Sequence, residues 1–235
     1  MKNERYRFFA LQKDTLPVIE KIKINMKLIF IAILIFSFQS ISGQTVIIND
    51  TLEIEFKKTK SISNSYLHSN VKMKKSEDAK RILVRCDLKS LFKKPVDINA
   101  FSLIDTENKL RYRIVTYFGY KKGPSLFTHG DLGRVYLKKE VLNKRGKQYK
   151  FLPPYDESMP DSFETYKFEN YVNVEVPMRY YNMVSGEVIS VIYYSPSQKT
   201  NFRADMQFVV LTNQKKPKLE LYYGNKFISV IEFEK

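Results

Sequence analysis

The sequence predicts an all-β fold, an antiparallel β-sandwich, and two observations lead to it. Apolar and polar residues alternate over short runs rich in Val, Ile, Tyr and Phe, with turn-forming residues between the runs. After residue 43, no segment shows a convincing helical period. Regularly spaced strands without helices are typical of antiparallel sheets that share one core. We therefore expect a single β-domain over residues 44–235.

Before this domain, the sequence carries the pattern of an export signal. Met26 and Lys27 precede an apolar run of eleven residues, 28–38, shorter than the ~20 residues that an α-helix needs to cross a bilayer. Ser40, Ser42 and Gly43 then offer small residues for cleavage. We predict a signal peptide over residues 26–43 and an exported protein, periplasmic or secreted. The alternative is a signal anchor left in the inner membrane.

Residues 1–25 do not belong to this pattern. They are charged, contain Pro17 and show no sustained period. We expect them to be a gene-model extension, with translation starting at Met26, or else a short tail on a signal-anchored protein.

The strands are predicted from the alternation alone. Residues 45–56 hold two short runs, and Gly224-Asn225 favours a tight hairpin turn between the last two strands. Cys86, the only cysteine, lies on the apolar side of its strand, so we expect a buried side chain and no intramolecular disulfide. The other expected strands are residues 81–89, 96–104, 110–118, 171–178, 187–194, 206–211, 219–223 and 227–233.

Between these strands, residues 120–170 form an irregular basic insertion. Pro124, Pro153, Pro154 and Pro160 interrupt it. Within it, residues 134–150 fit either a short helix or an edge hairpin. A long broken stretch inside a domain is either a functional loop or a plain insertion.

The strand at residues 82–88, the Lys93-Lys94-Pro95-Val96 turn and the run at residues 101–105 resemble secreted bacterial immunoglobulin-like domains of unknown function. The closing part of that pattern resembles residues 186–196 and the final hairpin. The resemblance covers residues 80–119 and 186–235. It implies an immunoglobulin-like sandwich outside the cytoplasm, and it implies no catalytic residues.

Charge points to the class of partner. Residues 44–235 hold 33 of the 40 basic and 22 of the 25 acidic residues, a net charge of +11. A basic surface favours an anionic envelope glycan or a membrane surface. Nucleic acid is not expected for an exported chain, and protein partners are not indicated. The alternative is a basic surface without a specific partner.

Seven residues of the insertion make the candidate binding site. Cations capture anionic groups, and tyrosine rings offer flat faces for stacking. Arg134 and Lys150 flank the segment, and Glu140 is its single acid. We expect a non-enzymatic binding module that contacts anionic polymers through Tyr136, Lys138, Lys139, Lys144, Arg145, Lys147 and Tyr149. The alternative is a charged loop that contacts only water.

Signals for catalysis are weak. The phosphate-binding, dinucleotide, zinc-helix and Gly-x-Ser-x-Gly motifs are absent from the sequence. We therefore expect no cofactor and no metal. His129, which precedes Gly130-Asp131, and His68 are the two histidines, so a hydrolase with its site in the 120–170 insertion is the main alternative. A signal-anchored structural envelope protein is another. The acids around Pro160 match no calcium loop, and we expect a solvated turn at Asp156, Glu157, Asp161 and Glu164.

Overall fold

The computed structural model describes residues 45–62, 66–68, 71–73, 78–121, 134–182, 186–212 and 216–232. All of them belong to the unit Gly43–Lys235. The predictions for the export signal and for residues 1–25 lie outside the described residues, as does His129.

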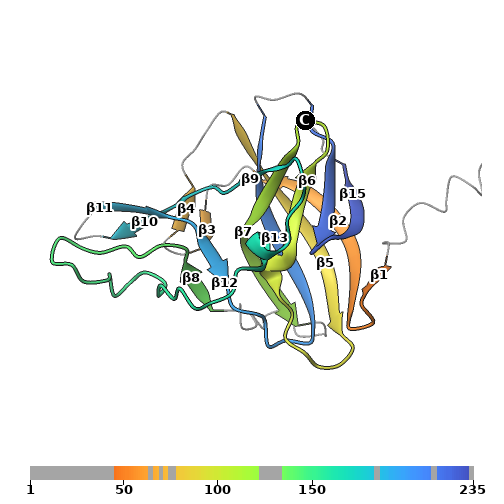
Figure 1. Cartoon of the computed structure of the whole chain (residues 1–235), viewed down its shortest axis with the longest axis horizontal. Coiled ribbons are helices and arrows are strands. Elements are labelled where there is room, and N and C mark those ends of the chain that lie inside the picture. The colour runs from red at the N-terminus through yellow and green to blue at the C-terminus, as the bar shows by residue number, and fades with distance from the viewer. Residues whose placement is uncertain are drawn as a thin grey trace, which may run out of the picture. The chain divides into compact units, whose positions relative to one another are not determined.

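The prediction of an all-β chain is confirmed. Strands make up 56% of the described residues, and nearly all of their pairings are antiparallel. The main sheet has nine strands, with β9 (Val172–Val174) added in parallel to β7. In order along the sheet (Figure 1), the other eight strands are β1 (Thr45–Ile48), β2 (Leu52–Ile62), β5 (Ala79–Ser90), β13 (Asn201–Leu211), β7 (Leu110–Lys121), β6 (Phe101–Asp105), β14 (Leu219–Tyr223) and β15 (Lys226–Ile231).

This sheet curls until its two ends almost meet. Strand β15 contacts β1 and β2, and the Thr59 hydroxyl donates a hydrogen bond to the carbonyl of Glu232 at 3.3 Å. The sheet is therefore nearly closed into a barrel, and the predicted immunoglobulin-like sandwich is not confirmed. Alternation fixes which face of a strand is apolar, but it does not fix curvature. Register shifts in the pairs β2–β5, β13–β7 and β14–β15 are irregularities of the kind that bend and twist strands.

The core lies on the concave side of the main sheet. On β5, Cys86 is fully buried, as predicted, with Val84 and Leu88 beside it. On β13, Phe202 and Phe208 face the same core. These large apolar side chains supply the hydrophobic stabilisation of the domain. The described residues contain no disulfide, since Cys86 is free.

Two smaller sheets complete the fold. The predicted strand at residues 187–194 breaks at Val191, because its two halves join different sheets. A four-stranded sheet has the order β11 (Gly186–Ser190), β10 (Met178–Asn182), β4 (Val71–Met73) and β3 (Tyr66–His68). A two-stranded sheet joins β12 (Ile192–Tyr194) to β8 (Val135–Leu137).

Two predicted strands are shorter or divided in the structure, each for a local reason. Residues 96–104 form a strand only from Phe101, because the Asp97 carboxylate accepts from the Asn99 backbone N–H at 2.9 Å and caps the short helix η1 (Ile98–Ala100). The predicted strand over residues 171–178 splits into β9 and β10, since Pro177 offers no N–H. Strands 81–89 and 110–118 are confirmed as β5 and β7, and the Gly224-Asn225 hairpin is confirmed.

The described part of the insertion is not a long helix. Residues 134–150 begin with β8 and continue into an extended arm, which favours the hairpin alternative. Helix α2 (Ser162–Thr165) is four residues long, and its buried Phe163 lies against Arg111 and Arg113 of β7. The segment after the arm therefore covers this part of β7.

Candidate functional site

The arm, residues 139–154, leaves the body of the domain directly after β8 and returns to it (Figure 1). At its base, the Leu137 N–H donates to the Pro154 carbonyl at 2.9 Å, and Leu137 pairs with Tyr155. Val141 and Leu152 pack against the hydrophobic core. The base of the arm is therefore held by both hydrogen bonds and apolar contacts.

The outer end of the arm is a defined turn. The Asn143 side-chain oxygen accepts from the backbone N–H groups of Arg145 and Lys147, at 2.8 and 3.1 Å. The Asn143 backbone pairs with both Lys147 and Gly146. Gly146 has a φ of 69°, in the left-handed region that glycine adopts at no steric cost. These internal hydrogen bonds hold the backbone of the turn, and its cationic side chains project from it. We call such a turn self-bound.

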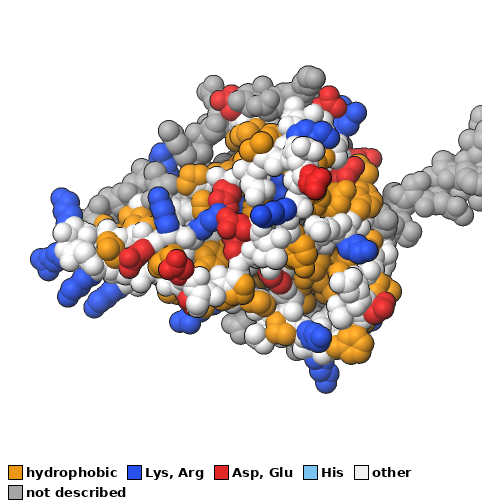
Figure 2. All heavy atoms as spheres, in the orientation of Figure 1, with side chains coloured by type: hydrophobic (Ala, Val, Ile, Leu, Met, Phe, Trp, Pro, Cys, Tyr) orange, Lys and Arg blue, Asp and Glu red, His pale blue; other side chains and the backbone are white. Residues whose placement is uncertain are grey.

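Cations dominate the surface of this turn. Figure 2 shows Lys and Arg side chains gathered at the outer end of the arm. Lys144, Arg145, Lys147 and Lys150 are exposed, and none of the four forms an ion pair with a described residue. We call these four residues the arm cations. Lys139, also exposed, lies nearer the base.

The two tyrosines of the predicted site do not present exposed rings beside the arm cations. Tyr136 is buried on β8, where its ring stacks on Tyr193 with 5.7 Å between centroids. Tyr149 is half-buried and packs against the core. Of the seven predicted residues, the structure therefore brings Lys144, Arg145 and Lys147 together at the tip and uses both tyrosines for packing.

Lys138 is also separated from the arm cations. Its ammonium donates to both oxygens of Glu175 at 2.7 Å and to Glu164. Burial alone would lower the pKa of Lys138, but these hydrogen bonds outweigh burial and raise the pKa above its usual value. Its charge is therefore already compensated within the protein.

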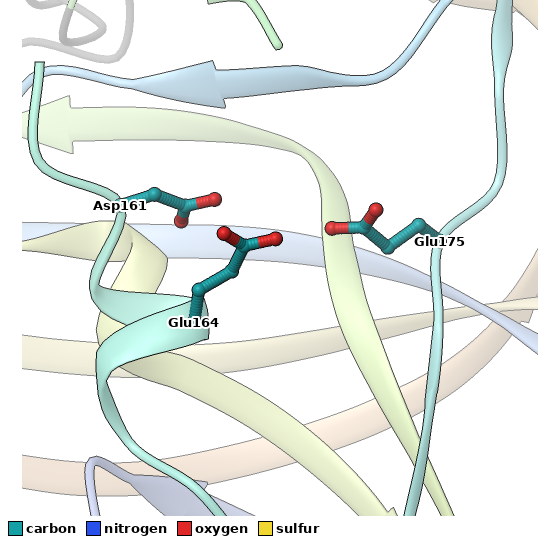
Figure 3. A group of neighbouring side chains, drawn as sticks. All are labelled: Asp161, Glu164 and Glu175. Atoms are coloured by element: carbon teal, nitrogen blue, oxygen red, sulfur yellow. The ribbon is translucent and has the colours of Figure 1, made fainter. Parts of the chain in front are cut away.

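These contacts belong to a cluster that we call the clamp: Arg113, Lys138, Asp161, Glu164 and Glu175. Arg113 is only 3% exposed. It holds Asp161 through two parallel hydrogen bonds, and its Nε donates to Glu175 at 2.8 Å. Figure 3 shows the three carboxylates converging from α2 and from the segment that follows β9. The clamp thus ties β7 to residues 161–175.

The three carboxylates have the composition of a metal site, since hard cations bind clustered oxygens. One ligand atom from each of Asp161, Glu164 and Glu175 lies within 4.8 Å of the others. Arg113 and Lys138 already bind these groups, however. Two cations against three anions leave a net charge of about −1. Three carboxylates without cations beside them would offer a divalent ion much more negative charge. We therefore assign the cluster to the architecture of the insertion.

The sequence analysis predicted a solvated turn that included Asp161 and Glu164, and it did not identify Arg113 or Glu175. Asp161 instead caps α2 through the Phe163 N–H at 3.2 Å and meets a buried guanidinium. Arg111 and Arg113 alternate with Tyr112 on β7, a pattern typical of a strand with one face in water. Only the chain that folds over this face from residues 161–175 buries them.

Arg111 shows how tightly this face is covered. Its Nη1 donates to the carbonyls of Phe163 and Tyr166 at 2.6 and 2.5 Å, and its guanidinium lies 4.0 Å from the Phe163 ring centre. Burial lowers the pKa of Arg111 to about 10, and the neighbouring charge of Arg113 adds to the effect. Its Nε and Nη2 have no hydrogen-bond partner among the described residues.

A hollow of about 470 Å³ opens beside the clamp, at the root of the arm. Lys138 and Glu175 bind each other on its wall, and Lys139 adds an exposed cation. Pro177, Ser190 and Val191 complete the lining. The hollow is open to solvent, and the Ser190 hydroxyl on its lining donates to the Val191 carbonyl at 3.2 Å and not to a base.

No family model, no curated protein and no solved structure matches the chain. Among the described residues, no helix is long and apolar enough to cross a membrane.

Proposed function

We propose that the protein is a non-enzymatic binding module that contacts anionic polymers or surfaces through the arm cations. One observation carries the proposal. Lys144, Arg145 and Lys147 lie on a self-bound turn at the end of a projecting arm, Lys150 follows three residues later, and none of the four has a carboxylate partner among the described residues. By contrast, Arg85 with Asp205 and Arg203 with Asp87 are cross-strand ion pairs on the main sheet.

The contrast has a physical consequence. A cation that is already bound by a carboxylate gains little from an external anion, because the new contact replaces an existing one. A cation that meets only water attracts anions over roughly one Debye length, about 8 Å at physiological salt. The arm therefore gathers several cations that are available for binding within one short segment.

From the sequence, we further propose that residues 26–43 direct export, which would place the arm in reach of envelope glycans and membrane surfaces. The expected protein in native cells begins at Gly43 or Gln44, as intact mass and N-terminal sequencing would show. A species that retains residues 28–38 in the membrane fraction would contradict cleavage. An immunoglobulin-like relationship stays a prediction on the motifs quoted above.

The binding proposal is tested by removing the arm cations together. In the variant Lys144→Gln, Arg145→Gln, Lys147→Gln, Lys150→Gln, we expect affinity for dextran sulfate to fall on the order of a hundredfold at low salt, since each exposed contact contributes up to about 1 kcal/mol. Binding is measured by calorimetry over a salt series, and the variant should also lose most of the salt dependence.

A matched control removes the same charge elsewhere. Lys58, Lys60, Lys216 and Lys226 are exposed and form no ion pair with a described residue. Replacing these four by Gln should weaken binding much less than the arm variant does. Equal losses in the two variants would show that net charge, and not the arm, determines binding, and would overturn the proposal.

A further inference from the structure

The arm carries apolar side chains beside its cations. Phe151 is 78% exposed, more than any other large hydrophobic residue that the structure describes, and Leu142 is 45% exposed. Leu142 pairs with Gln148 across the turn. Phe151 lies four residues after Lys147, so at most about 14 Å of chain separates the two.

Exposed apolar groups of this size have a cost in water that a partner can remove. The exposure is specific to Phe151, because the neighbouring apolar side chains on the same limb are partly buried. Tyr149 and Leu152 on the same limb turn inward to the core, while Phe151 and Lys150 point outward. The limb therefore has apolar side chains on both faces, and on the face that meets water Phe151 stands beside Lys150.

The chemistry of the tip separates two anionic partners. Recognition of a sugar polymer relies on hydrogen bonds to its hydroxyl groups, and the tyrosines predicted to lie beside the cations, Tyr136 and Tyr149, are packed inside. Phe151 and Leu142 have no hydrogen-bonding side-chain groups to offer a glycan. A lipid surface takes both parts, because cations bind its headgroups and apolar side chains enter the boundary with the acyl chains.

We infer that the arm is a membrane-surface anchor: its cations bind anionic lipid headgroups while Phe151 and Leu142 enter the interface. The inference rests on the proposed function, which it narrows from anionic surfaces in general to an anionic bilayer. The self-bound turn and the pinned base let the arm meet the bilayer with little loss of conformational freedom.

The chain contains no tryptophan, so a single introduced indole reports on its own position. In the full chain with Phe151→Trp, we expect a blue shift of emission with vesicles of phosphatidylcholine and phosphatidylglycerol in equal parts. Lipids brominated on the acyl chain should then quench the emission. Vesicles of phosphatidylcholine alone should give neither effect.

The control places the indole at another exposed phenylalanine beside two lysines. Phe92 is 64% exposed and precedes Lys93 and Lys94 in the turn after β5. Phe92→Trp should show no blue shift and no quenching. The absence of a shift at position 151, or an equal shift at both positions, would overturn the membrane inference. Because every variant carries the same N-terminal residues, binding through residues 28–38 would be common to all of them.

A second variant separates this inference from the proposed function. Leu142→Ser with Phe151→Ser should weaken binding to the anionic vesicles about tenfold, because two partly immersed apolar side chains are lost. It should leave binding to dextran sulfate unchanged. Unchanged vesicle binding in this variant would overturn the anchor while leaving the anionic-binding proposal intact. Unchanged binding of both probes in the four-Gln arm variant would overturn the two together.

Discussion

The arm and the clamp both take residues from the 120–170 insertion, and they use charge in opposite ways. In the clamp, Arg113 and Lys138 are held by three carboxylates at the surface of β7. In the arm, cations of the same types extend into water from a turn that Asn143 organises. The difference teaches that cation density does not define a binding surface. A binding surface needs cations that the fold both leaves without carboxylates and brings together in one place.

Buried tyrosines of the domain, which have no counterpart in the exposed arm cations, should give the largest effect, at alkaline pH. Burial raises the pKa of Tyr112 to about 12, and it raises the pKa values of Tyr180, Tyr194 and Tyr223 as well. In the unfolded chain, tyrosine ionises near pH 10. The contribution of each buried, neutral tyrosine to the free energy of unfolding is therefore complete below pH ~10. As pH rises further, this contribution is lost at about 1.4 kcal/mol per pH unit for each buried tyrosine.

Urea unfolding between pH 8 and 12 measures this loss. Tyr112→Phe should make the decline shallower by one tyrosine's share, since the phenylalanine has no proton to lose. The raised pKa of Lys138 acts in the same direction, because the cation that stabilises the clamp is lost as pH rises through that pKa. A free energy of unfolding that is equal at pH 8 and pH 11 would contradict the burial of these rings.

Breaking the clamp should have the next largest effect. Arg113→Met leaves Asp161 and Glu175 without their buried partner, and removing one member of a buried ion pair costs about 3 kcal/mol or more. Arg111→Met on the same face is the comparison variant. Arg111 has no described carboxylate partner and leaves two nitrogens unbonded, so we expect a loss of about 1 kcal/mol from its carbonyl acceptors. Chemical denaturation of both variants checks the order, and a larger loss for Arg111 would reverse our interpretation.

Changes in the arm should have the smallest effect on stability. The four-Gln arm variant removes charges that contact only water, so its free energy of unfolding should stay within about 0.5 kcal/mol of the parent. Together with Arg113→Met, it forms a double test: one variant loses binding and keeps stability, and the other loses stability. A destabilised arm variant would mean that these cations serve the fold, as those of the clamp do.

The sequence located the insertion, but it did not show which of its basic residues form ion pairs and which stay exposed. It selected Lys138 and Lys144 as equivalent, because both are lysines in one basic run. Glu175, which binds Lys138, lies 37 residues away, and no local pattern connects the two. It also missed Phe151, since an isolated phenylalanine in an irregular segment is as compatible with a core as with a surface.

The sequence by itself determined the β-rich fold, the burial of Cys86 and the places of β5 and β7, because alternation and turn residues act over a few neighbouring positions. Tertiary structure decided the closure of the main sheet, the burial of Arg111 and Arg113, and the exposure of the arm cations. Curvature, burial and ion pairing arise between segments that are distant in the chain. Each depends on which surfaces pack together, and that is determined by the burial of apolar surface over the whole domain.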